Sequence, residues 1–278
     1  MKNVPMRIKN FPISGLPLQN KASQPARNLR LEIEYDGTGY NGWQIQRGKK
    51  DKTSKRKAKT IQEVIENTLQ KILQERIKLI VSGRTDSGVH AKGQVANFKT
   101  NSPITLLRLR KALNGLLPKD ISINKIEEVE LNFHSRFDAK SKLYRYTILN
   151  GSHPCALLSR YVYYFPHPLN IRLMKKEAKA LIGRHNFKSF QASDKKNIDS
   201  MRTIEKLNIV KEGNLIYIYI IGDGFLYNMA RNIAGALIEV GRGRFKEGSL
   251  KEIIAAKDRR RAGPLSAAKG LCLLRVEY

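Results

Sequence analysis

Apolar side chains recur along this chain with two different periods, and the order of those periods limits the folds open to it. Residues 29–36 alternate between apolar and polar side chains, which predicts a strand with one buried face. Thr60 and Glu63 then form a capping box, and the apolar residues from 61 to 73 fall on one helical stripe. The other elements expected in the first half are a buried strand over 77–81, a strand that holds Val95 and Phe98, and a helix over about 105–117.

The second half of the chain has a similar outline. A strand over 143–149 is followed by an amphipathic helix over 170–182, which Gly183 ends. Strands outnumber the crossovers that a parallel sheet needs, so we expect an α+β protein. It would have two similar lobes, with mixed or mostly antiparallel sheets flanked by helices and an active-site cleft between the lobes. The remaining expected elements are a hairpin of two β-rich runs over 203–211 and 215–221 around Gly213 and Asn214, helices over about 226–240 and 249–256, and a closing strand over 271–278.

Composition divides the chain into three parts. Residues 1–28 are basic, contain four prolines and lack the continuous apolar core of a secretory signal, so we expect a flexible leader, with an organelle transit peptide as an open alternative. Residues 29–135 form the expected N-terminal lobe and residues 136–278 the C-terminal lobe. The basic stretch 47–59 predicts an exposed loop, and contact with phosphates is as good an interpretation of it as an insert without functional consequence.

The charge of the chain points to a polyanion as partner. Lys and Arg total 52 against 24 Asp and Glu, a formal net charge of +28 over 278 residues. Such an excess strongly attracts nucleic acid. A basic surface without a partner is the less favoured interpretation, and an anionic membrane surface comes third.

Cysteine usage and hydropathy limit the cellular compartment that we expect for the protein and its relation to membranes. Cys155 and Cys272 are the two cysteines, and their separation fits neither a disulfide framework nor a zinc site, which favours a reducing cytoplasm. No apolar run approaches the roughly 20 residues needed to cross a bilayer, so we expect no membrane span.

The stretch from Gly83 to Ala91 is the densest candidate for chemistry. In an extended segment, residues two apart point to the same side, so Arg84 and Asp86 are expected to project together. The guanidinium would keep Asp86 ionised, as a carboxylate nucleophile has to be. From these residues alone, a salt bridge in a turn is the better interpretation, because such pairs are common and often contribute little.

The same stretch resembles the signature of the tRNA pseudouridine synthase A family, Gly-Arg-Thr-Asp-Ala-Gly-Val-His-Ala, from which only Ser87 departs. The resemblance runs from about Leu29 to the C-terminus. The further matching blocks are Tyr35-Asp36-Gly37-Thr38, Gly42-Trp43-Gln44, Phe133-His134-Ser135-Arg136-Phe137, Lys142-Leu143-Tyr144-Arg145-Tyr146, Phe187-Lys188-Ser189-Phe190, Gly224-Phe225-Leu226-Tyr227-Asn228-Met229-Ala230-Arg231-Asn232 and Gly270-Leu271.

The resemblance implies a chemistry for particular residues. Asp86 matches the family's nucleophile, Tyr144 the tyrosine that stacks on the target base and assists proton removal at C5, and Arg231 an arginine that pairs with the nucleophile. Without the resemblance, Tyr144 would be a core aromatic and Arg231 a solvent-facing arginine. Arg84 would hold either Asp86 or a phosphate. His90 stays outside the catalytic set, because a loop histidine is more often structural.

The resemblance also implies a substrate and a state of assembly. Members of the family convert uridine to pseudouridine at positions 38, 39 and 40 of the tRNA anticodon arm and work as homodimers. The isomerisation needs no cofactor and no metal, and the sequence contains no dinucleotide fingerprint, phosphate-binding loop or metal-ligand cluster. The alternatives are a non-catalytic RNA-binding protein on the same fold and a synthase for another RNA site. The loops at 47–59 and 261–269 depart from the family and leave the positioning of tRNA open.

Overall fold

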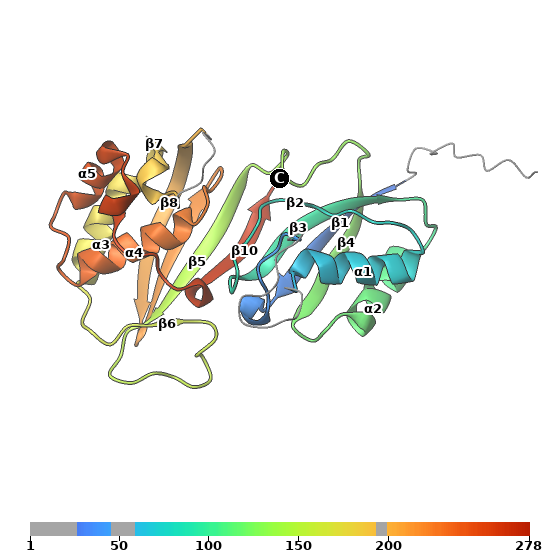
Figure 1. Ribbon diagram of the computed structural model, residues 1–278, viewed down its shortest axis with the longest axis horizontal. Helices are drawn as coiled ribbons and strands as arrows, with labels where there is room; N and C mark the ends of the chain where they lie inside the picture. Colours follow the sequence, from blue (N-terminus) through green and yellow to red (C-terminus); the bar gives the residue numbers. More distant parts are fainter. Residues whose placement is uncertain (1–26, 46–58, 193–198) are drawn as a thin grey trace, which may run out of the picture.

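One mixed sheet runs through the whole molecule. The computed structural model describes residues 27–45, 59–192 and 199–278, and within them ten strands form a single sheet in the order β4-β1-β3-β10-β5-β9-β8-β7, with β2 on β3 and β6 on β5. Figure 1 shows the molecule drawn out along this sheet, with the N-terminal helices at one end and the C-terminal helices at the other. The predicted α+β class is confirmed, but the two halves share one sheet where separate sheets were expected.

The N-terminal half places two helices beside strands β1, β3 and β4. Helix α1 begins after Thr60, whose hydroxyl accepts from the Glu63 N–H at 3.4 Å, and it buries Ile61, Ile65 and Leu69 completely. The predicted helical stripe is therefore the face that packs inward. The elements of this half are β1 (Arg27–Tyr35), α1 (Ile61–Leu73), β2 (Ile80–Val81), β3 (His90–Thr100), α2 (Leu106–Leu116) and β4 (Ile121–Val129), with a 3-10 turn at Gly37–Gly39.

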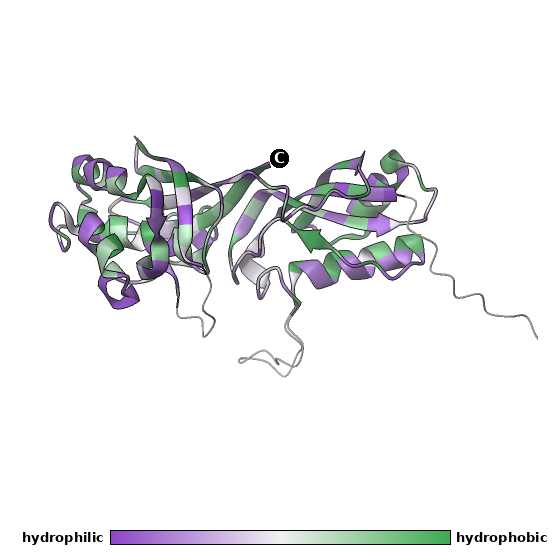
Figure 2. Cartoon of the chain, turned by 90° about the horizontal axis from the view of Figure 1, so that it is seen from above, coloured by the Kyte–Doolittle hydropathy of each residue, from purple (hydrophilic) through white to green (hydrophobic). Residues whose placement is uncertain are grey.

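The C-terminal half surrounds a helix that is buried on almost every side. Helix α4 has only Arg231 partly exposed among its thirteen residues, as expected for a helix that is apolar all round. In Figure 2, purple and green bands alternate along the strands as well as along the helices at both ends of the molecule. The elements are β5 (Ser141–Leu149), β6 (Tyr163–Tyr164), α3 (Ile171–Ala178), β7 (Gly183–Asn186), β8 (Met201–Glu212), β9 (Leu215–Gly222), α4 (Met229–Gly241), α5 (Ser249–Ala256) and β10 (Leu271–Glu277), with 3-10 turns at Lys179–Leu181, Phe187–Phe190, Arg259–Ala262 and Ala268–Gly270.

Strand β10 joins the two halves. It pairs in parallel with the start of β3, where Cys272 lies opposite His90, and antiparallel with β5, where Leu273 lies opposite Tyr144. A Cβ on Gly93 would lie 2.5 Å from the Leu274 carbonyl oxygen, so the backbones of β3 and β10 approach closely at this point. The strand that closes the sheet therefore brings the segment after residue 82 next to β5.

Several predicted boundaries differ from the structure. Strand β1 begins at Arg27, inside the predicted leader, and the predicted 77–81 strand shrinks to β2 because the Leu79 N–H donates to the Glu66 side chain. The predicted 170–182 helix ends at Ala178 and continues as a 3-10 turn, and the helix predicted from 226 begins at Met229. Asn228 precedes α4 with a left-handed φ of 59°, which no helix interior tolerates.

Other expectations are met or stay untested. The hairpin of β8 and β9 forms as predicted, with Gly213 at a positive φ. No helix in the described part of the chain is long and apolar enough to cross a bilayer. Residues 47–58 of the expected 47–59 loop and all but the last two residues of the 1–28 leader lie outside the described residues, and the boundary between residues 135 and 136 stays a prediction.

Candidate active site

The Gly83–Ala91 stretch is held from below by buried hydrogen bonds. The Gln94 amide donates to the Gly83 carbonyl at 2.9 Å and accepts from the Ser82 hydroxyl at 2.7 Å. The Tyr35 hydroxyl lies 2.7 Å from the Thr85 hydroxyl. Because Tyr35, Thr85 and Gln94 are all buried, leaving any of these polar groups unpaired would be costly, and the loop has one strongly preferred position.

Close backbone contacts fix the same loop from the side. Gly42 has a φ of +82°, and a Cβ there would lie 2.7 Å from the Thr85 carbonyl oxygen. The Trp43 N–H donates to that oxygen at 3.1 Å. A Cβ on Gly37 would lie 2.0 Å from the Val89 carbonyl oxygen. The glycine-rich turn after β1 is therefore required because it packs directly against the loop that carries Asp86. Trp43 is fully buried.

Asp86 meets Arg231 across the junction of the two halves. A guanidinium nitrogen of Arg231 lies 3.4 Å from Asp86 Oδ2, and the side chains are 14% and 22% exposed. The guanidinium also donates to the Ser266 carbonyl at 2.9 Å and to the Asn228 side chain at 3.3 Å. Arg231 stands in the first turn of α4, where a solvent-facing arginine was the interpretation without the resemblance. The pairing that the resemblance implied is present.

Ser266 is brought to Arg231 by a close approach of backbone to α4. A Cβ on Gly235 would lie 2.1 Å from the Pro264 carbonyl oxygen, so only glycine lets this segment pack against the helix. The Ser266 hydroxyl donates to the Arg231 carbonyl at 2.7 Å. Helix and segment therefore hold the arginine by both its backbone and its side chain.

The expected pairing of Arg84 with Asp86 is wrong. Arg84 is exposed, and within the described residues no acid lies at ion-pair distance from its guanidinium. Residues 82–83 form a bend, residues 87–88 form a turn, and residues 84–86 belong to no strand, so the two-residue periodicity of a strand does not fix the relative direction of their side chains. The interpretation as a salt bridge in the turn fails for the same reason, and Arg84 is free to bind another group.

The pKa of Asp86 departs from the expectation that its arginine keeps it low. Burial raises the pKa of the carboxyl above its usual range, and the Arg231 guanidinium opposes that rise only in part. The ionised form of Asp86 is therefore less stable than a carboxylate in water, because Arg231 offsets only part of the desolvation cost. A desolvated anion is a better nucleophile than a hydrated one, provided that the pH is high enough to ionise it.

Tyr144 lies beside the acid on strand β5. It is 6% exposed, and its ring meets the Phe225 ring edge to face, with centroids 4.9 Å apart. Burial raises the pKa of its hydroxyl well above the usual range, and the nearby Tyr35 and Asp86 raise it further. The hydroxyl is therefore neutral at physiological pH. Among the described residues it has no hydrogen-bond partner, which leaves it available to a substrate.

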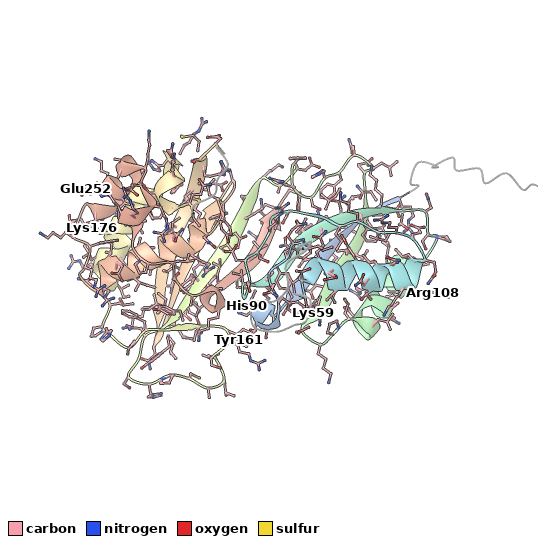
Figure 3. The ribbon with its side chains drawn as sticks, viewed as in Figure 1. Lys59, His90, Arg108, Tyr161, Lys176 and Glu252 are labelled. Atoms are coloured by element: carbon pink, nitrogen blue, oxygen red, sulfur yellow. The ribbon has the colours of Figure 1, made fainter. Side chains whose placement is uncertain are left out.

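Sequence reasoning missed the side chains that surround the catalytic candidates. His90 Nδ1 lies 3.1 Å from the Gly37 N–H and 3.1 Å from Asp36 Oδ1, and Nε2 lies 2.9 Å from the Arg160 carbonyl oxygen. The imidazole packs on Tyr161 at 5.2 Å, and Figure 3 shows the two side chains together at the lower edge of the junction. His90 is thus a structural link between distant segments. The Tyr35-Asp36-Gly37 block was a signal that something packs there, but nothing in the sequence named the partner.

Comparison with known proteins gives a consistent result. The family model described as tRNA pseudouridine synthase matches residues 33–138 and 178–278. The tRNA pseudouridine synthase A 2 of Clostridium perfringens is 46% identical over 252 residues, which cover 91% of this chain and 100% of that protein. The tRNA pseudouridine synthase A of Acetivibrio thermocellus is 44% identical, and that of Caldicellulosiruptor saccharolyticus is 46% identical, each with the same coverage.

Solved structures resemble the chain more distantly. A chain of an archaeal box H/ACA sRNP Nop10-Cbf5 complex aligns with a TM-score of 0.33 and 11% identity, over 86% of this chain and 58% of that one.

Proposed function

We propose that this chain, which belongs to the tRNA pseudouridine synthase family, isomerises uridine to pseudouridine at positions 38, 39 and 40 of the tRNA anticodon arm. The observation that carries the proposal is the contact between Asp86 and Arg231, which come from opposite halves of the chain to one point. The substrate positions follow from the resemblance to the family.

Asp86 is the proposed nucleophile. Arg231 contacts Oδ2, whereas no hydrogen bond or ion pair from the described residues reaches Oδ1. Oδ1 is therefore the oxygen that bonds to the nucleotide. As Oδ1 bonds to the ribose carbon, the N-glycosidic bond breaks and N1 of the uracil keeps its electron pair. The uracil turns in place, and its C5 bonds to the ribose carbon as the Asp86 ester bond breaks. C5 then loses its proton and N1 gains one. The product has the same atoms as the substrate, so the reaction needs no redox partner or group donor.

Tyr144 is the proposed platform for the uracil. A flipped base needs an aromatic surface on which to stack. The edge-to-face contact with the Phe225 ring fixes the orientation of the Tyr144 ring. The Tyr144 hydroxyl is neutral, so Tyr144 is not a preformed phenolate. It assists the loss of the proton from uracil C5 through a hydrogen bond made by its hydroxyl. Tyr144→Phe preserves the stacking and removes that step.

The partner and the setting of the protein are also proposals. The net charge of +28 suits a folded RNA read mainly by its backbone. We propose a homodimer located in the cytoplasm. On strand β9, Ile216, Ile218 and Ile220 are fully buried, whereas Tyr217 and Tyr219 between them are only partly covered, which supports an interface on that face of the sheet. A solution mass of one chain at working concentration would contradict the dimer.

The function is tested by release of tritium from tRNA labelled at uridine C5, followed by mapping of the product. Wild-type protein is expected to release tritium and to place pseudouridine at 38, 39 or 40. Product at another position would assign a different RNA site, and RNA binding without release would assign a non-catalytic role.

The proposed chemistry is tested by Asp86→Asn. Turnover is expected to fall by a factor of about a thousand or more, because the nucleophile is gone. Since the folded-state pKa of Asp86 is raised, its ionised form costs folding free energy at neutral pH, so the variant should unfold no earlier than wild type. Retained turnover in a folded Asp86→Asn protein would remove Asp86 from the mechanism.

A further inference from the structure

Lys142 belongs to a row of side chains on one face of strand β5. Lys142, Tyr144 and Tyr146 are buried, whereas Leu143 and Arg145 between them are half-buried, so the three share a face. Tyr146 donates to the Ala267 carbonyl at 2.9 Å, and Tyr144 lies beside Asp86. Lys142 is the next position along the strand, about 7 Å further at the usual rise per residue.

The Lys142 side chain is enclosed by both halves of the molecule. A Cβ on Gly83 would lie 3.3 Å from Lys142 Cε, so the alkyl chain lies against the residue that precedes Arg84. In the sheet, Lys142 pairs with Gly222, and the Phe225 ring covers Gly222 with an atom 3.4 Å from where its Cβ would be. Lys142 is consequently only 8% exposed.

The enclosed Lys142 ammonium forms no ion pair with any acid in the described residues. Within the described residues no hydrogen bond or ion pair involves the Lys142 side chain. Its nitrogen is also not among the fully buried unpaired atoms, which are Trp43 Nε1 and Arg145 Nε. The nitrogen therefore still reaches the surface. Burial lowers the pKa of Lys142, nearby Arg136 lowers it further, and Asp223 opposes them. The desolvation cost of a buried ammonium without an ion-pair partner is offset only when an anion binds to it.

We propose that the Lys142 ammonium binds the phosphate of the RNA backbone next to the target nucleotide. The inference rests on the proposed function, in which the ribose lies at Asp86 and the base at Tyr144. Lys142 continues that line along β5, and a phosphate flanks every nucleotide. The bound phosphate fixes the position of the ribose relative to Asp86, so Lys142 is a positioning residue that acts through the substrate backbone.

The test combines a protein change with an RNA change. Anticodon-arm RNAs carry one uncharged methylphosphonate at the linkage 5′ or 3′ of the target uridine, and kcat/KM is measured for wild type and Lys142→Met. One of the two linkages is expected to cost wild type about tenfold and to cost Lys142→Met almost nothing, because the partner is already lost. Equal losses in both proteins at both linkages would overturn the inference.

Two further variants separate this role from a structural one. Lys142→Arg keeps the charge and is expected to recover part of the activity together with the sensitivity to the uncharged linkage. Lys125→Met removes an exposed lysine on β4 that pairs with Glu127 at 2.6 Å, and it should keep the full wild-type sensitivity. Lys142→Met should also reduce the slope of log kcat/KM against log salt by about one unit, which a packing defect would not do.

The outcomes distinguish this inference from the proposed function. Absence of product from every unmodified RNA with wild-type protein would count against the function. Normal product with additive losses would count against Lys142 alone. If Lys142→Met does not fold, the wild-type measurements and Lys142→Arg still decide, because insensitivity of wild type to both uncharged linkages excludes a phosphate contact.

Discussion

The two halves of the molecule hold their site residues in different ways. Asp86 stands on a loop without regular structure, and buried side chains from β1 and β3 determine its position. Arg231 stands on a helix that is buried on nearly all sides and is fixed by the backbone packed against it. The position of Asp86 therefore depends on a polar network and that of Arg231 on packing, so mutations around the two residues should have different effects.

Arg231→Met should have the largest effect, because it removes the cation from a partly desolvated carboxylate. We expect kcat/KM to fall by about a factor of a thousand, near the upper end for loss of one charged contact in a site. Arg231→Lys retains the charge but loses the contacts to Ser266 and Asn228 together, so it should recover only part of that loss. Single-turnover rates measure both, and full recovery in Arg231→Lys would show that orientation is unimportant.

Gly235→Ala tests whether packing positions the arginine. The added methyl would overlap the Pro264 carbonyl and push Ser266 away from Arg231, so we expect about 3 kcal/mol of lost stability and a fall in kcat/KM of about a hundredfold. Gly115→Ala in α2 is the matched control: its Cβ would meet nothing within 4 Å, and the variant should gain about 0.5 kcal/mol. Normal activity in Gly235→Ala would show that the packing of this segment against α4 is not needed for the reaction.

Gln94→Leu tests the polar network under Asp86. It leaves the Gly83 carbonyl and the Ser82 hydroxyl without their partner, which should cost about 3 kcal/mol of stability and about tenfold in kcat. Asn97→Leu removes an equally buried amide from the same strand, at the contact with Ser135. It should destabilise similarly and change kcat less. If chemical denaturation and kcat change together in both variants, the loop has no special link to β3.

The pH dependence should give the smallest effect. Because burial raises the pKa of Asp86, the acid limb of kcat/KM should lie above the usual carboxyl pKa, with activity rising as pH increases through it. Arg231 lowers that pKa, so in Arg231→Met the limb should move to higher pH. A pH–rate profile for both proteins measures the shift. A limb that moves to lower pH would mean that a different group is being titrated.

Local patterns identified the elements, whereas long-range contacts were outside their reach. Thr60 and the apolar stripe after it predicted α1 because capping and periodicity act within a few residues. The pairing of Asp86 with Arg231 spans 145 positions, and only the family resemblance implied it. Arg84 was misjudged because alternation holds in regular strands, and residues 84–86 belong to none. The Gln94 network gave no signal, since a buried glutamine looks in sequence like any polar residue in a strand.

The insertion of β10 between β3 and β5 restricts how the enzyme can respond to its substrate. Two lobes joined by a flexible linker can open and close as rigid bodies, but here a hinge at the junction would have to break main-chain hydrogen bonds on both edges of β10. Large opening motions are therefore unfavourable. Access for the uridine has to come from rearrangement of surface loops and from distortion of the RNA itself, which makes the deformability of the RNA a determinant of which substrates are accepted.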